Sequence, residues 1–142
     1  MRISLANPVL FTEGSADLLP EVNGFLLGLS KIIQFHKPAG VIIEGHTDDT
    51  PIHTERFPSN WDLSSARALN VLRLFQADGV PANIMAAIGY GEYRPKVKFG
   101  KNADREAKGV NRRVEILLQL HPAQPKPASA LSVEPSDSMT TR

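Results

Sequence analysis

The sequence contains no cysteine, which excludes disulfide bonds, thiol nucleophiles and cysteine-ligated zinc sites. It also has no excess of either charge, because 16 Lys and Arg residues stand against 15 Asp and Glu residues, for a net charge of +1. That balance argues against a nucleic-acid-binding protein, since phosphate binding needs a clustered excess of cations, and against a polybasic membrane-surface protein. No run of 18 apolar residues is present, so we expect no membrane-spanning helix in this chain.

The first residues lack the apolar stretch that a secretory signal peptide carries. Two interpretations therefore stay open: a cytosolic protein, or a part of a longer protein whose targeting segment lies elsewhere. The remaining composition is that of a soluble globular domain, with 42% apolar and 22% charged residues in 142. A chain of this size can bury enough apolar surface to form a core without disulfides or metals.

The composition changes near residue 121. Four of the 11 prolines fall in residues 121–142, among Ser, Thr and Ala and without a periodic apolar face. Such a segment cannot bury enough surface to offset the entropy of ordering it. We therefore predict one domain over residues 1–120 and a disordered tail over residues 121–142.

Four short apolar segments are typical of buried strands. They are residues 9–11, 41–43, 84–88 and 114–120. The last segment alternates, which places Val114, Ile116 and Leu118 on one face and Arg113 and Glu115 on the other.

Two longer segments have helical periodicity. Apolar residues at steps of three, four and one predict a helix that starts at Ser15 as its N-cap and continues to residue 33. A Ser-x-x-Asp box at Ser59 predicts a second helix, which ends at Asp78 and Gly79. The order of the elements predicts an α/β fold, an α+β sandwich with two long helices packed on one sheet whose strands are partly parallel.

The densest polar sequence, residues 44–49, follows the second predicted strand, where open α/β sheets tend to bind ligands. A purely structural interpretation is a turn, in which Asp side chains cap the backbone and His46 satisfies backbone groups. A metal site is a second interpretation, with His46, Asp48, Asp49 and His53 as ligands, although their spacing matches no helical His pair. A hydrolase is a third, with His46 or Asp48 as general base, although the chain has no Gly-x-Ser-x-Gly elbow.

A fourth interpretation pairs Asp48 with Arg67, which lies near the start of the second predicted helix. A helix N-terminus and a guanidinium fork both favour a carboxylate, and Asp48 could accept from an ammonium. The two side chains together would suit a zwitterion, such as the head of an amino acid. The alternative is a plain salt bridge between them. We expect both at the rim of a cleft, where their replacement leaves the fold intact.

Five motifs follow one another along residues 45–116. They are Gly45-His46-Thr47-Asp48, Asn60-x-x-Leu63-Ser64-x-x-Arg67-Ala68, Gly79-Val80, Gly89-Tyr90-Gly91-x-x-x-Pro95 and Asn111-Arg112-Arg113-Val114-Glu115-Ile116. This set resembles the OmpA-like C-terminal domain. The resemblance implies a mixed four-stranded sheet with helices on one face, and non-catalytic, non-covalent binding of peptidoglycan through the diaminopimelate of its stem peptide.

The resemblance also implies roles for particular residues. Asp48 would bind the diaminopimelate ammonium and Arg67 its carboxylate. Five further residues would complete the site: Thr47 and Asn60 as polar groups, Leu63 and Ala66 as walls, and Arg112 from the last strand. Many outer-membrane relatives carry an acidic residue where this chain has Thr12, so we expect that contact to differ here.

The segment between Asp48 and Arg67 is long and includes Thr50-Pro51-Ile52 and Phe57-Pro58-Ser59-Asn60. It resembles the flagellar motor stator B family (MotB and its paralogue MotD) more than porin or lipoprotein members. That resemblance implies a homodimeric periplasmic domain of an inner-membrane protein, which anchors an ion channel with its stator A-type subunit to the cell wall. Insert 50–59 would reshape the pocket rim or contact partners.

Two alternatives to a stator domain stay open. One is an outer-membrane or lipoprotein wall anchor of the same superfamily. The other is a wall-acting hydrolase or metalloenzyme that uses His46, Asp48 and His53. We expect no cofactor. Trp61 is expected to pack the start of the second helix as a hydrophobic staple, with an exposed stacking platform as the other interpretation.

Overall fold

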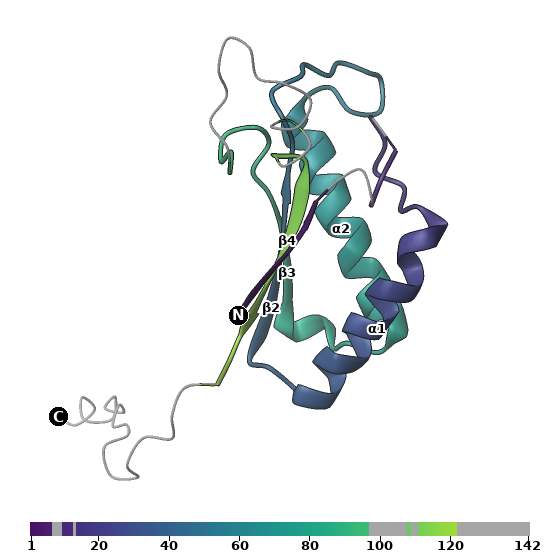
Figure 1. The fold of residues 1–142 in the computed structure, drawn as a ribbon, viewed down its shortest axis with the longest axis vertical. Coiled ribbons are helices and arrows are strands. Elements are labelled where there is room, and N and C mark those ends of the chain that lie inside the picture. The colour runs from purple at the N-terminus through teal and green to yellow at the C-terminus, as the bar shows by residue number, and fades with distance from the viewer. Residues whose placement is uncertain (7–9, 13, 97–107, 109–110, 122–142) are drawn as a thin grey trace, which may run out of the picture.

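The computed structural model describes residues 1–6, 10–12, 14–96, 108 and 111–121. In chain order, the elements are β1 (Arg2–Ala6), α1 (Pro20–His36), β2 (Gly40–His46), α2 (Asn60–Asp78), a 3-10 turn η1 (Ala82–Ile84), β3 (Met85–Gly89) and β4 (Arg113–Gln119) (Figure 1). Neither helix in this described part of the chain combines the length and the hydropathy that a membrane crossing needs.

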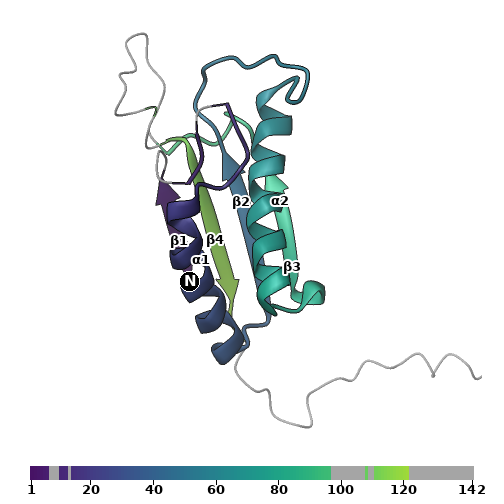
Figure 2. The same ribbon diagram turned by 90° about the vertical axis from the view of Figure 1, so that its right-hand side faces the viewer.

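The four strands form one mixed sheet in the order β1-β4-β2-β3. β2 and β3 are parallel, as expected for strands joined through a helix, and β4 runs antiparallel to both β1 and β2. Both helices cover the same face of the sheet, with α1 on the side of β1 and β4 and α2 on the side of β2 and β3 (Figures 1 and 2). The predicted α/β architecture is therefore confirmed.

The core lies between this face and the two helices. Alternate residues of β2 and β4 point into it, among them Val41, Ile43, Val114 and Ile116, all at most 1% exposed. They pack with the apolar stripes of both helices and with Val80. These stripes comprise Val22, Leu26, Leu29 and Ile33 of α1 and Ala68, Val71 and Phe75 of α2.

The prediction of a first strand at residues 9–11 is wrong. The strand is Arg2–Ala6, which pairs with β4, while Val9 lies outside the described residues. Leu10 and Phe11 are buried in the core, and Phe11 forms only an isolated bridge with Leu18. Burial in a connecting segment accounts for their apolar character without a ladder of hydrogen bonds.

The prediction that Ser15 caps the first helix is also wrong. α1 begins at Pro20 with Leu19 as its N-cap, and Ser15 Oγ instead accepts from the Asp17 N–H at 3.0 Å. A proline at the first helical position lacks only an N–H that would have no partner there, and its fixed φ suits the helix. Pro20 therefore sets the start of α1.

The second helix is as predicted. Ser59 is the N-cap of α2, its side chain accepts from the Asp62 N–H, and Gly79 ends the helix with a φ of 121°. The third and fourth strands also lie where expected, within one residue or two. The tail predicted for residues 121–142 lies outside the described residues except for His121 and stays a prediction.

Candidate functional site

A cavity of about 210 Å³ opens where β2 ends and α2 begins. Six of the seven predicted site residues line it: Thr47, Asp48, Asn60, Leu63, Arg67 and Arg112. The seventh, Ala66, does not line the cavity but packs beside Leu63 in a small apolar cluster with Ala16 and Phe57. The remaining lining residues are Gly14, Thr50, Pro51, Ile52 and Thr54.

Four of those lining residues belong to insert 50–59, so this segment forms part of the pocket rim. Its conformation is held locally. The Thr54 N–H donates to the Phe57 carbonyl at 3.0 Å, and Thr54 Oγ1 accepts from the Phe57 N–H at 2.9 Å. Ile52 and the buried Phe57 pack against Leu63, which gives the cavity its apolar wall.

Asp48 is 5% exposed and holds the polar side of the cavity. Its Oδ1 accepts from the Thr50 N–H at 2.8 Å, so the turn interpretation is correct for this residue. Its Oδ2 forms an ion pair with Arg112 Nη1, rather than the salt bridge to Arg67 that one interpretation expected. A carboxylate has about four acceptor positions, so Asp48 keeps capacity for a ligand donor.

Arg67 is 3% exposed and as deeply buried as Asp48, so the expectation that both lie at a cleft rim is wrong. Its Nε donates to the Ser15 carbonyl at 2.8 Å and its Nη2 to the Thr12 carbonyl at 3.3 Å. The guanidinium carbon lies 4.8 Å from the centre of the Phe11 ring. No ion pair of Arg67 is found within the described ranges. The contacts that stabilise this buried cation are therefore backbone carbonyls and one aromatic face.

Burial lowers the pKa of Arg67 to about 10. Repulsion by Arg112 acts in the same direction, and attraction by Asp48 opposes both. The three side chains together carry two positive charges and one negative charge. The cavity is therefore suited to a ligand that brings a carboxylate to Arg67, and Asp48 offers a place for a cationic donor beside it.

Thr47 and Asn60 fix the backbone around the cavity. The Thr47 N–H donates to the Gly91 carbonyl at 2.9 Å, and its hydroxyl donates to the Asp48 carbonyl at 2.9 Å. Asn60 Nδ2 donates to the Thr50 carbonyl and to Glu92 Oε1, both at 3.1 Å. Because both amide donors are used, the Asn60 side chain can offer a ligand only its oxygen.

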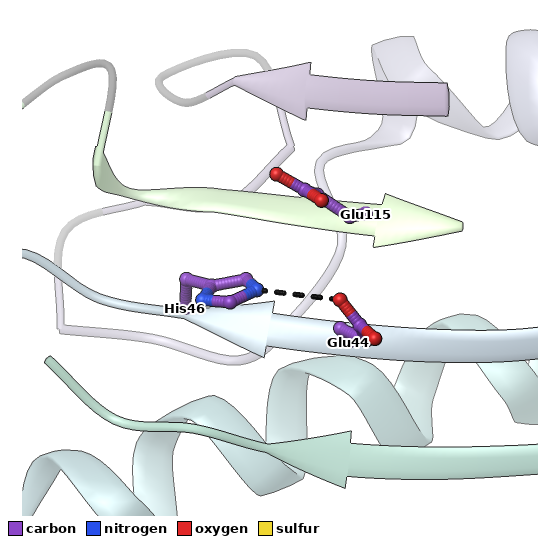
Figure 3. A group of neighbouring side chains, drawn as sticks. All are labelled: Glu44, His46 and Glu115. Atoms are coloured by element: carbon purple, nitrogen blue, oxygen red, sulfur yellow. Dashed lines mark ion pairs between the residues drawn. The ribbon is translucent and has the colours of Figure 1, made fainter. Parts of the chain in front are cut away.

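His46 does not belong to this cavity. It lies on the other face of the sheet, where its Nε2 is 3.7 Å from Glu44 Oε1 and Glu115 stands on the neighbouring strand (Figure 3). His53 is exposed, with its Nδ1 3.3 Å from the Pro58 carbonyl oxygen. Among the described residues, the only group of three that could hold a metal is Glu44, His46 and Glu115. The alternative interpretation of a metal site at His46, Asp48, Asp49 and His53 is therefore not supported by the described residues.

The carboxylates of that second group already have cationic partners. Arg2 Nη1 lies 2.9 Å from Glu44 Oε1 and also pairs with Glu115, whose other oxygen pairs with Arg113. Burial and the positive charge of Arg113 lower the pKa of His46 to about 4, so the ring is neutral at pH 7. The two guanidinium groups supply the positive charge that a metal ion would bring, so we assign no metal here.

Arg112 and Arg113 point in opposite directions, as strand alternation predicts. Arg112 lines the cavity, whereas Arg113 belongs to the ion pairs on the far face of the sheet. Trp61 does not pack as a staple; it is 51% exposed and stacks on Tyr93. Sequence reasoning missed Glu92, although it directly follows the Gly89-Tyr90-Gly91 motif.

Comparison with known proteins gives consistent matches. The OmpA family matches residues 10–109. Motility protein B of Bacillus subtilis is 35% identical over 119 residues, which are 83% of this chain and 44% of that protein. The peptidoglycan-binding protein ArfA of Mycobacterium tuberculosis is 32% identical over 111 residues, 78% of this chain and 32% of that protein.

A solved structure has the same fold. The periplasmic domain of Helicobacter pylori MotB is 28% identical and superimposes with a TM-score of 0.75, covering 85% of this chain and 76% of that one. The chain thus spans less than half the length of the two curated relatives above.

Proposed function

Because the chain belongs to the OmpA family, we propose that it is a non-catalytic domain that binds peptidoglycan in the cavity between β2 and α2. The observation that carries the proposal is the buried guanidinium of Arg67 at this cavity. It has backbone carbonyls and an aromatic face around it, and the described residues give it no carboxylate. A ligand carboxylate would complete its surroundings, with a charge-assisted and potentially bidentate contact.

The ligand we propose is the diaminopimelate of the stem peptide. The end of its side chain carries an ammonium and a carboxylate on one carbon. Arg67 would bind the carboxylate, and the remaining acceptor positions of Asp48 would bind the ammonium. Arg112 would hold Asp48 in place, Thr47 and the Asn60 oxygen would bind polar groups, and Leu63 and Ala66 would support the apolar wall.

For the longer protein, we propose a flagellar stator B-type role. The chain would be the periplasmic domain of an inner-membrane protein and would fix a torque-generating channel to the cell wall. The support is the likeness to motility protein B and to the periplasmic domain of MotB, together with the rim formed by insert 50–59. Homodimerisation and pairing with a stator A-type subunit belong to the same proposal.

A second candidate is a wall anchor outside the flagellar motor, in an outer-membrane protein or lipoprotein. The match to the mycobacterial peptidoglycan-binding protein, whose name states peptidoglycan binding and no motility role, supports a wall anchor outside the motor. Both candidates use the same cavity in the same way. They differ in what the domain is attached to. Deletion of the gene followed by a motility assay would distinguish them, because only loss of a stator domain should stop motility.

The binding proposal is tested by co-sedimentation of the full chain with purified peptidoglycan sacculi. We expect the unchanged protein to sediment with sacculi, and the Asp48→Asn variant, which is similar in shape, to stay in solution. Asp78→Asn, at the opposite end of α2, is the matched control and should sediment normally. Equal sedimentation of all three proteins would refute the assigned site, and failure of the unchanged protein to sediment would refute the function.

A further inference from the structure

An exposed aromatic pair stands beside the cavity. Trp61 and Tyr93 are 51% and 62% exposed, and their rings stack with centroids 5.0 Å apart and planes inclined by 23°. Large aromatic side chains contribute most when they are buried, so two of them side by side in solvent are an unusual use of the residue type. Their remaining surface is available to a ligand.

The pair is attached rigidly to the cavity. Trp61 follows Asn60, which lines the cavity and donates to Glu92 Oε1, and Tyr93 follows Glu92. The Tyr93 N–H donates to the Tyr90 carbonyl at 3.3 Å. A ligand group in the cavity and a second group on the aromatic rings would therefore be held in a fixed relation.

The turn beneath the rings is also fixed. The Gly91 N–H donates to Ser64 Oγ at 2.9 Å, and the Gly91 carbonyl accepts from Thr47. Gly91 has a φ of +64°, and a Cβ built on it would lie 3.4 Å from the Tyr93 ring and 3.6 Å from the Trp61 ring. The aromatic pair thus packs over this glycine, which ties it both to α2 and to the residues that follow β2.

We propose that Trp61 and Tyr93 form a subsite for a sugar ring, an N-acetylhexosamine of the peptidoglycan glycan strand. The inference rests on the proposed function and extends it from the peptide to the glycan. One face of a pyranose presents C–H groups, which favour the electron-rich face of an aromatic ring. Glu92 and Asn60, at the junction between rings and cavity, place polar groups where sugar hydroxyl and acetamido groups would lie.

The size of the cavity supports a sugar subsite outside the cavity. At about 210 Å³, it is smaller than the roughly 300–1,000 Å³ of sites that enclose a whole drug-sized ligand, so it suits one side-chain end. Diaminopimelate is the third residue of a stem peptide that is joined to the sugar. Three extended residues span up to about 10–11 Å, which lets a sugar linked to a bound diaminopimelate reach the rim of the cavity.

The test compares two soluble ligands: the diaminopimelate tripeptide alone, and the same tripeptide linked to its disaccharide. Trp61 is the single tryptophan of the chain, so its fluorescence reports directly on this site. We expect the disaccharide ligand to change the Trp61 emission and to bind about tenfold more tightly than the tripeptide. The tripeptide should leave the emission nearly unchanged.

Calorimetry on variants of the full chain completes the test. Trp61→Ala and Tyr93→Ala should each bind the tripeptide like the unchanged protein and lose the advantage of the disaccharide. Tyr93 lies outside α2, so its variant tests the subsite without altering the start of the helix. Phe35→Ala, which removes an 80% exposed aromatic ring at the end of α1, is the control and should change neither affinity.

Two results would overturn the subsite. One is equal affinity of the unchanged protein for both ligands with no change in emission. The other is an equal loss of affinity for both ligands in the two aromatic variants, which would make the rings a support for the cavity. A protein that binds neither ligand would instead overturn the proposed function, and the subsite with it.

Discussion

Gly45 and Gly89 lie opposite each other in the parallel register of β2 and β3, and both face the first turns of α2. A Cβ on Gly45 would lie well inside 3.0 Å of the Ser64 carbonyl oxygen, and one on Gly89 well inside 3.0 Å of the Ser65 backbone. The absence of both side chains lets the helix rest directly on the sheet. This close approach sets the position from which α2 presents Arg67 to the cavity.

We predict that Gly45→Ala and Gly89→Ala each lower the free energy of unfolding by about 3 kcal/mol, the upper end of the usual cost of overpacking, because the new methyl group meets helix backbone that cannot move alone. Urea unfolding measures the change. Gly24→Ala is the control: nothing lies within 4 Å of a Cβ there, and a helical alanine should stabilise by about 0.5–1 kcal/mol. A tolerated Gly45→Ala would show that α2 can shift away from the sheet.

Arg112→Ala should mainly weaken ligand binding, whereas Arg113→Ala should mainly weaken the fold. Arg112 is 25% exposed at its side chain and holds Asp48, so its loss should weaken binding to sacculi with little change in stability. Arg113 is buried against Glu115, so its loss should cost about 3 kcal/mol of stability and leave peptidoglycan binding intact when the variant is folded. Sedimentation with sacculi and urea unfolding should be measured on both variants. Equal losses of binding and of stability in the two variants would contradict the prediction.

Arg67→Ala should destabilise the fold as well as abolish binding. The side chain donates to the carbonyls of Thr12 and Ser15, and truncation leaves these buried acceptors without partners at a cost of about 2–4 kcal/mol. Thermal melting of the variant beside Asp48→Asn, which should melt close to the unchanged protein, measures the difference. Equal melting temperatures of Arg67→Ala and the unchanged protein would show that the guanidinium does not support this segment.

Acid should weaken the fold through His46. Burial first, and repulsion by Arg113 second, lower its pKa to about 4, against the opposing attraction of Glu115 and Glu44. The unfolded chain has an ordinary imidazole pKa of about 6.5, so it binds more protons between pH 6.5 and about 4. The free energy of unfolding should therefore fall as the pH drops through this window, by about 3 kcal/mol in total.

The control for this prediction is His46→Gln, which cannot take up the proton. Between pH 6.5 and 5, its stability should change much less than that of the unchanged protein. At lower pH, both proteins should weaken further, because the ion pairs with Arg113 and Arg2 lower the pKa of Glu115 and protonation removes that stabilisation. Identical pH dependence of the two proteins between pH 6.5 and 5 would refute the role of His46.

Local signals explain what the sequence predicts correctly. Ser59 and Gly79 directly flank the two ends of α2. The apolar run Val41-Ile42-Ile43 lies within the strand β2. Of the six predicted site residues that line the cavity, five directly follow β2 or lie in the first turns of α2. The sixth, Arg112, directly precedes β4. The position of His46 was also readable: strand alternation places it with Glu44, on the face opposite Ile43.

Contacts between distant segments explain what the sequence does not reveal. β1 pairs with β4 across most of the chain, as in the register of Arg2 with Leu117, and no short motif marks that pairing. The ion pair of Asp48 with Arg112 joins residues 64 positions apart. Arg67 is buried because Phe11 and the Thr12 and Ser15 carbonyls, in the segment before α1, pack over it. The local pattern of that segment predicts a strand and a helix start instead, neither of which forms there.

The most direct measurement is calorimetric binding of two tripeptides that differ only at the third residue, diaminopimelate or lysine. Lysine keeps the ammonium but lacks the carboxylate that Arg67 would bind. We predict that the full chain binds the diaminopimelate peptide at least about 30-fold more tightly, the equivalent of about 2 kcal/mol, and that Arg67→Lys removes most of this preference. Equal affinity for both peptides would contradict the assignment of Arg67 to the ligand carboxylate.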